Sequence, residues 1–219
     1  LNLYGNDCGL FGMVIRGFSQ VGVQGTMTTD YWVSGIQIGS PDKGNVIINN
    51  LKGIEIWCEE DCHIQSNYVG TDLNFQPGLG NSDGGIEMFV GVGDDINIGG
   101  DRLVNEGNFV CSNGGFGIRM GKDTEPNNFI PMISGNTVGT DATGTVNLAN
   151  TGSEPGIRVG DLDRGSVIGG PGGRGNIVAF HENGIGVTSE RNQITRNIIY
   201  CNTVKGIELF GGTGNNNVV

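Results

Sequence analysis

The chain has few basic residues, few aromatic residues and no long apolar run. Its 219 residues include 12 Lys and Arg against 23 Asp and Glu, which gives a formal net charge of −11. Binding to phosphate groups needs clustered cations, so this balance argues against nucleic acid and anionic membranes as main partners. No segment reaches the roughly 18 apolar residues of a membrane-spanning helix, so we expect no membrane insertion.

Proline is also scarce, at 6 residues, and the 42 glycines follow no strict three-residue period, which excludes collagen. No basic-then-apolar leader opens the chain at Leu1, and there is no initial Met. We therefore interpret the chain as a mature or excised segment.

The five cysteines are an odd number, so they cannot all pair within one chain. Cys58 and Cys62 either close a small-loop disulfide or are free. Cys111 and Cys201 occupy similar repeat positions, and we expect both to be small buried hydrophobes. No Cys or His spacing suits a structural zinc, and no cofactor is expected.

A short motif recurs along the chain: Gly-Ile followed by an apolar residue two positions later. Its spacings run from 22 to 39 residues, which indicates a short unit with insertions of varying length. A Gly- and Asn-rich unit of about twenty residues predicts an all-β solenoid. The copies are Gly53-Ile54, Gly85-Ile86, Gly117-Ile118, Gly156-Ile157, Gly184-Ile185 and Gly206-Ile207, with a looser one at Gly22-Val23.

The shortest unit, residues 184–205, holds three short apolar runs separated by Gly, Asn or Ser. Three strands per turn describe a parallel β-helix, and about seven coils would form a rod near 34 Å long. Gly70-Thr71-Asp72 returns at Gly139-Thr140-Asp141, so the full repeat is two coils from about residue 22. We expect one domain over 1–219, with a less regular first coil over 1–21.

Aligned repeats place Asn50, Asn113, His181 and Asn202 in one column before a corner. Stacked amides can satisfy corner backbone groups, so we expect a structural ladder in which His181 replaces an Asn. The other histidine, His63, has no obvious partner in the sequence.

Three segments carry a resemblance: G-N-V-I-I-N-N-L-K-G-I-E-I, S-N-Y-V-G-T-D and G-N-T-V-G-T-D-A-T-G-T. They resemble the right-handed parallel β-helix repeat proteins of bacterial surfaces and secretomes, which share the pectin-lyase-like fold. The resemblance implies an extracellular setting. That fold includes lyases, hydrolases, adhesins and structural repeats, so it does not select an activity.

Polygalacturonase-like enzymes of this fold resemble one another in D-D, G-H-G and R-I-K segments. Asp94-Asp95 is similar to the first, but this chain has no G-H-G or R-I-K segment. We therefore interpret Asp94-Asp95 as the turn before Ile96.

Strict alternation in the Gly-Ile strands turns the third and fifth residues outward. The third positions include Glu55, Glu87, Arg119 and Arg158, and the fifth include Trp57 and Phe89. In one reading, sugar rings stack on Trp57 and Phe89 while Glu55, Glu87 and Arg119 bond hydroxyl groups. In the other, the Gly-Thr-Asp loops cover the aromatic rings and Glu87 simply pairs with Arg119.

The insertions after Gly-Thr-Asp are a second candidate site. Their oxygen-bearing side chains suit Ca²⁺, but turn chemistry alone also explains Asp after Gly-Thr. The residues concerned are Asp72, Asn74 and Asp83 in one loop and Asp141, Thr143 and Glu154 in the other.

Two classes of function remain. The first is an extracellular structural or adhesive rod that contacts polysaccharide on one face. We expect this rod to stack head to tail on further copies or repeats, because the last residues, Asn217-Val218-Val219, show no cap. The second is a secreted carbohydrate-active enzyme using Glu55, Glu87, Arg119 and Arg158. The first is favoured because no catalytic motif emerges.

Overall fold

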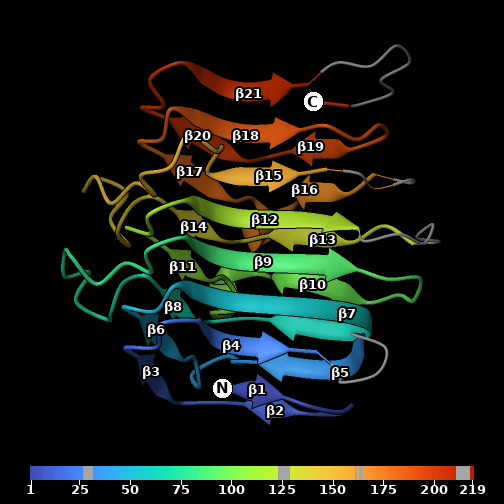
Figure 1. Ribbon diagram of the computed structural model, residues 1–219. Coiled ribbons are helices and arrows are strands. Elements are labelled where there is room, and N and C mark those ends of the chain that lie inside the picture. The colour runs from blue at the N-terminus through green and yellow to red at the C-terminus, as the bar shows by residue number, and fades with distance from the viewer. Residues whose placement is uncertain (27–31, 123–128, 161, 163–164, 211–217) are drawn as a thin grey trace.

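The structure is a computed structural model that describes residues 1–26, 32–122, 129–160, 162, 165–210 and 218–219. Every pair of named strands is parallel, and partners along the chain lie one coil apart (Figure 1). The described residues form no α-helix, only the short 3₁₀ turns η1 (Arg102–Val104) and η2 (Gly172–Arg174). The expected all-β, parallel, solenoid-like architecture is confirmed.

The strands form three stacks, each running along the solenoid. The first stack holds β1 (Asn2–Leu3), β4 (Val21–Gly25), the start of β7 (Lys52–Ile64), β9 (Gly84–Val90), β12 (Phe116–Lys122), β15 (Ile157–Val159), β18 (Asn183–Val187) and β21 (Lys205–Leu209). The second holds β2 (Gly9–Leu10), β5 (Val33–Ile38), the end of β7, β10 (Ile96–Gly99), β13 (Met132–Ser134), β16 (Val167–Gly169) and β19 (Gln193–Thr195). The third holds β3 (Val14–Arg16), β6 (Val46–Ile48), β8 (Tyr68–Val69), β11 (Phe109–Val110), β14 (Thr137–Val138), β17 (Ile177–Ala179) and β20 (Ile198–Tyr200).

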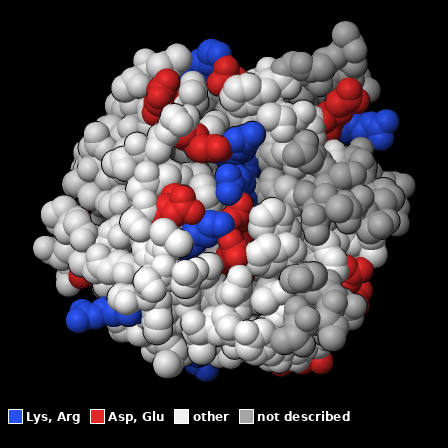
Figure 2. All heavy atoms as spheres, viewed as in Figure 1, with Lys and Arg blue, Asp and Glu red and all other residues white. Residues whose placement is uncertain are grey.

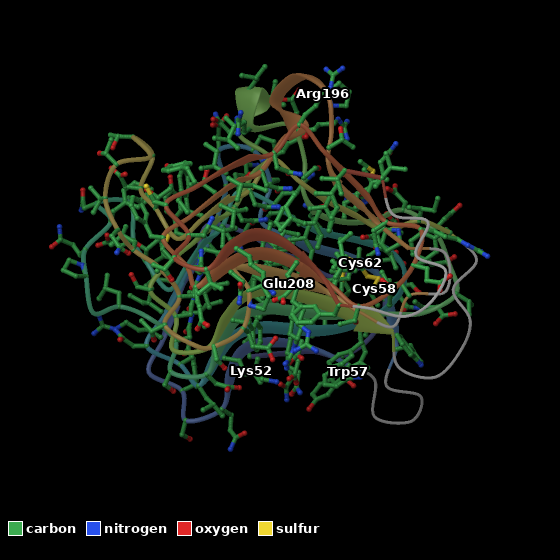
Figure 3. The ribbon with its side chains drawn as sticks, turned by 90° about the horizontal axis from the view of Figure 1, so that it is seen from above. Lys52, Trp57, Cys58, Cys62, Arg196 and Glu208 are labelled. Carbon is green, nitrogen blue, oxygen red and sulfur yellow. A yellow bond between two sulfur atoms is a disulfide. The ribbon has the colours of Figure 1, made fainter. Side chains whose placement is uncertain are left out.

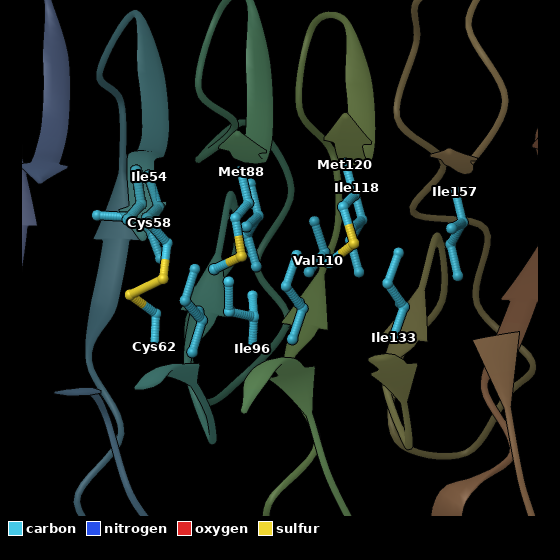
Figure 4. Close-up of a cluster of buried hydrophobic side chains, with 14 of the residues drawn as sticks. Ile54, Cys58, Cys62, Met88, Ile96, Val110, Ile118, Met120, Ile133 and Ile157 are labelled. Carbon is cyan, nitrogen blue, oxygen red and sulfur yellow. A yellow bond between two sulfur atoms is a disulfide. The ribbon is translucent and has the colours of Figure 1, made fainter. Parts of the chain in front are cut away.

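The repeated isoleucines set the register of the first stack. The isoleucines that pair directly from coil to coil are, in order, Ile54, Ile86, Ile118, Ile157, Ile185 and Ile207. The first five are fully buried, as are the apolar residues two positions later (Figure 4). Burying these side chains supplies most of the favourable free energy, about 1.5–3 kcal/mol each. In β21 the inward register is kept, because Ile207 pairs with Ile185 and packs against the core, but Ile207 is only half-buried and Leu209 is 42% exposed. Among the described residues, no strand lies on the far side of β21.

Two ladders of buried polar side chains run along the corners of the solenoid. In each, a side-chain amide donates to the side chain one coil away at 2.8–3.1 Å, and a backbone N–H donates to the same acceptor. We call them the all-asparagine ladder (Asn45, Asn67, Asn108, Asn136, Asn176 and Asn197) and the histidine-containing ladder (Asn50, Asn81, Asn113, Asn150, His181 and Asn202). The predicted column is confirmed, and Asn81 and Asn150 are further rungs that loop insertions hid from the alignment.

Four of the five cysteines divide into three kinds. Cys58 and Cys62 form a disulfide across the corner where β7 passes from the first stack to the second. Cys111 is buried, which raises the pKa of its thiol to about 12. The prediction that Cys201 is also buried is wrong. Tyr200 occupies the register of Ala179, so Cys201 falls one residue later, and a one-residue shift turns a side chain to the opposite face.

Candidate functional site: a charged groove on the first stack

Charged residues in the third position of the first-stack strands join Lys52 and Glu154 in a continuous ion-pair column (Figure 2). Lys52 Nζ lies 2.5 Å from both Glu55 and Glu87, and Arg119 Nε donates to Glu87 Oε1 at 2.7 Å. Arg158 Nη1 contacts both oxygens of Glu154 at 2.7 and 2.6 Å. The expected Glu87–Arg119 pair is confirmed, and it is one step in a longer network.

The carboxylates of this column are more buried than strict alternation predicts. Glu55 is 7% exposed and Glu87 2% exposed, because Lys52 and Arg119 lie across them. The expectation that both glutamates face open solvent is therefore wrong. Burial alone would lower the pKa of Lys52, but hydrogen bonds and charges from Glu55 and Glu87 outweigh it and raise that pKa above its ordinary value. Lys52 therefore stays a cation over the whole ordinary pH range.

Trp57 and Phe89 stack on each other on adjacent coils. Their ring centroids are 4.7 Å apart, their planes differ by 19°, and both side chains are half-buried. Seen along the solenoid, Lys52 and Trp57 point outward from the first stack, whereas Cys58 and Cys62 lie at its corner (Figure 3). The exposed part of this pair gives the face an apolar wall beside its charges.

A groove of about 310 Å³ lies next to this aromatic pair. It exists because the column that holds Trp57 and Phe89 continues with Gly121 and Gly160, which have no side chains. A Cβ on Gly160 would lie 2.5 Å from the Thr188 hydroxyl, so the hollow depends on glycine. Phe89 bounds one end of the groove, and Glu87, Arg119 and Arg158 line its side.

The arginines keep part of their surface open to a ligand. Arg119 lies 4.3 Å above the ring of Phe116, and its side chain is 34% exposed, while that of Arg158 is 37% exposed. A guanidinium presents several N–H donors in one plane, which suits hydroxyl and carbonyl oxygens. The groove therefore combines planar donors with one aromatic edge.

The Gly-Thr-Asp loops do not contact Trp57 or Phe89 through any ring pair in the part of the chain that the structure describes. Phe75, from the first loop, packs edge-on against Tyr68 and Phe109, with centroids 6.1 and 5.0 Å apart. The second loop accepts a hydrogen bond at Gly144 from the Tyr200 hydroxyl. These contacts place Phe75 and Gly144 on the third stack, whereas Glu154 of the second loop pairs with Arg158 on the first stack. The cover of Trp57 and Phe89 by these loops stays a prediction. Tyr68 and Phe109 follow equivalent Asn residues, a signal that could have revealed their stacking.

The residues suggested for Ca²⁺ serve turns and ion pairs. Asp72 Oδ1 accepts the backbone N–H groups of Asn74 and Gln76 at 2.9 and 3.1 Å. Asp141 accepts the Thr143 hydroxyl at 2.8 Å and two backbone N–H groups at 3.1 Å, and Glu154 binds Arg158. Asp83 lies in the first loop, with its backbone N–H bonded to Leu51. Calcium binding at these loops stays a prediction.

His63 has partners that the sequence did not suggest. Its Nε2 lies 3.2 Å from Asp61 Oδ1 and 3.4 Å from Asp95 Oδ2. Asp95 has a φ of 55°, which agrees with the expected turn before Ile96. The coil-to-coil register brings Asp95 beside Asp61, a proximity that linear spacing does not show.

Searches of protein-family models, curated proteins and solved structures found no significant match to this chain. Among the described residues, no helix has the length and apolar character needed to cross a bilayer.

Proposed function

We propose that the chain is an extracellular adhesive β-solenoid that holds a neutral saccharide in the first-stack groove. In this proposal the solenoid is right-handed, of the pectin-lyase-like kind, with about seven three-strand coils. The observation that carries the proposal is the hollow at Gly121 and Gly160, bounded by Phe89, Arg119 and Arg158. A sugar ring would lie against the edge of Phe89 while the guanidinium groups bond its hydroxyls.

The charge of the groove favours a neutral ligand. Lys52, Arg119 and Arg158 pair with Glu55, Glu87 and Glu154, three charges of each sign, so the column has no net charge at these residues. A charged polysaccharide would compete with these ion pairs, whereas hydroxyl groups add hydrogen bonds without breaking them.

The same ion pairs favour binding over hydrolysis. Glu87 Oε1 is held by Arg119 and Oε2 by Lys52, so neither oxygen is free to exchange a proton with a substrate. Glu87 is also the only carboxylate in the described lining of the groove. The enzymatic alternative based on Glu55, Glu87, Arg119 and Arg158 thus lacks an available acid or base at this position.

Affinity electrophoresis through gels that contain neutral polysaccharides tests the proposal. We expect retardation of the wild type and at least a fivefold loss of affinity in Phe89→Ala and Arg158→Ala. Phe75→Ala is the matched control, because Phe75 is a half-buried aromatic residue on the third stack. Equal losses in Phe75→Ala and Phe89→Ala, or no retardation on any neutral polysaccharide, would refute the groove as the binding site.

An assay for released reducing ends and unsaturated products separates binding from catalysis. We expect neither product from the wild type. Turnover that Glu87→Gln abolishes would contradict the adhesive proposal and support the enzyme.

A further inference from the structure

The corner after the disulfide brings together three metal-binding side chains from two coils. Asp61 and His63 belong to β7, and Asp95 immediately precedes β10. The coils are joined there by backbone hydrogen bonds from Asp61 N–H to Asp94 at 2.9 Å and from Cys62 N–H to Asp95 at 3.2 Å. This pairing fixes the backbones that carry the three side chains.

The distances between the side-chain atoms match a metal coordination shell. His63 Nε2 lies 3.2 Å from Asp61 Oδ1 and 3.4 Å from Asp95 Oδ2, and the three ligand atoms lie within 4.8 Å of one another. Two metal–ligand bonds of about 2.1 Å at angles of about 100–110° place their ligand atoms about 3.2–3.4 Å apart. The third distance, between the ligand oxygens of Asp61 and Asp95, reaches the same length after a small rotation of either side chain. Both side chains are more than 60% exposed, so this rotation is unhindered.

A neighbouring amide orients one of the carboxylates. Asn97 Nδ2 donates to Asp95 Oδ1 at 2.7 Å, which leaves Oδ2 directed at His63. Such outer contacts orient the ligands of protein metal sites and raise their affinity. The Cys58–Cys62 disulfide closes the same corner, so Asp61 is held within a covalent loop.

His63 and Asp95 also line a cleft of about 720 Å³ on the second stack. Gln65, Asn97, Glu106 and Arg174 line it as well. A metal bound by three protein ligands keeps at least one coordination position open, as catalytic zinc sites do. Here that position would face the cleft, where these polar groups could contact a ligand of the metal.

We propose that Asp61, His63 and Asp95 form a Zn²⁺-binding site with one coordination position open to this cleft. An imidazole with two carboxylates suits a first-row transition metal, whereas Ca²⁺ takes six to eight oxygen ligands. The same corner also carries Glu59 and Glu60 in β7 and Asp94 just before β10. Their negative charge attracts a cation to the corner. The site is independent of the saccharide groove, which lies on the first stack.

Metal titration of the full, untagged chain after chelator treatment tests this inference. Calorimetry with Zn²⁺ should show one site, and Co²⁺ should give the visible absorption bands of a low-coordinate site. His63→Ala and Asp95→Asn should each weaken Zn²⁺ binding at least 30-fold. Asp94→Asn removes the same charge from the same turn without removing a ligand, and it should weaken binding less than threefold.

Thermal unfolding without metal confirms that each variant is folded. His63→Ala should remain close to the wild type, because its imidazole is half-buried and its partners Asp61 and Asp95 are more than 60% exposed. Added Zn²⁺ should raise the melting temperature of the wild type and of Asp94→Asn only. Equal losses in Asp94→Asn and Asp95→Asn would show diffuse attraction to acidic residues and overturn the site. Undiminished binding by His63→Ala, or no binding by the wild type, would also overturn it.

Discussion

The two ladders occupy equivalent corners of the solenoid but differ at one rung. In the all-asparagine ladder, each interior amide accepts from one neighbour and donates to the other, as Asn136 does between Asn108 and Asn176. In the histidine-containing ladder, His181 Nε2 accepts from the Asn150 amide at 3.0 Å and from its backbone N–H at 3.3 Å. Among the described residues the ring donates to no further rung, and only the His181 backbone N–H reaches Asn202, at 3.0 Å.

This difference shows that the acceptor is the essential part of a rung. An imidazole nitrogen replaces the amide oxygen for both donors of Asn150, although His181 Nδ1 is buried without a hydrogen-bond partner among the described residues. Burial lowers the pKa of His181 to about 4, and the nearby Ala179 carbonyl offsets this only in part. The all-asparagine ladder therefore contains no titratable side chain, whereas the histidine-containing ladder includes an imidazole that must stay neutral.

Removing a central amide should have the largest effect on either ladder. Asn136→Ala leaves the Asn108 side-chain amide and backbone N–H without their acceptor and the Ile98 carbonyl without a donor. Unsatisfied buried groups cost about 1–3 kcal/mol each, so we expect a loss of about 4 kcal/mol in the free energy of unfolding. Asn113→Ala breaks the same kinds of bond in the other ladder and should cost the same. Denaturant unfolding at pH 7 measures both, and a large inequality would show that the corners are not equivalent.

Acid should distinguish the ladders almost as strongly. Because the pKa of His181 is lowered from 6.5 to about 4 on folding, the unfolded chain binds a proton in that interval and the folded chain does not. The stability from His181 is complete above pH 6.5, falls as pH drops toward 4, and changes no further below it. The loss is about 3 kcal/mol. Unfolding curves for wild type and His181→Asn between pH 7 and pH 4 isolate this term, and parallel curves would show that His181 does not titrate as described.

The terminal rungs should show a smaller difference. Asn197 accepts both the backbone N–H and the amide of Asn176, whereas Asn202 accepts only the backbone N–H of His181. Asn202→Ala should therefore cost about 1 kcal/mol less than Asn197→Ala. Denaturant midpoints measured side by side test this order. The reverse order would mean that the His181 side chain, and not only its backbone, bonds to Asn202.

Restoring the asparagine should have the smallest effect at neutral pH. His181→Asn replaces one acceptor with another and adds a donor toward Asn202, so we expect stability to change by no more than about 1 kcal/mol, in the favourable direction. The free energy of unfolding at pH 7.5 is the measurement. A loss of several kcal/mol would mean that the imidazole packs in a way that an amide cannot replace.

Local pattern alone predicted the strands of the first stack. The Gly-Ile repeat fixed which residues face inward, since side-chain alternation is a property of an extended backbone, and Ile54 to Ile185 are buried as expected. The histidine-containing column was found the same way, although Asn81 and Asn150 were missed because long loops precede them. The prediction that Cys201 is buried failed, because a shift of one position along a strand turns the side chain to the opposite face.

The sequence by itself determined the parallel strands, the inward apolar column and the Asn corners, because each depends on the residues of a single coil. Only the tertiary structure decided which side chains meet across coils. The near-complete burial of Glu87 depends on Lys52 and Arg119 from its neighbours, and the groove depends on Gly121 lying beside Gly160. The grouping of His63 with Asp61 and Asp95 likewise requires two coils in register. Insertions of unequal length separate these residues along the chain, so their contacts follow from stacking and not from spacing.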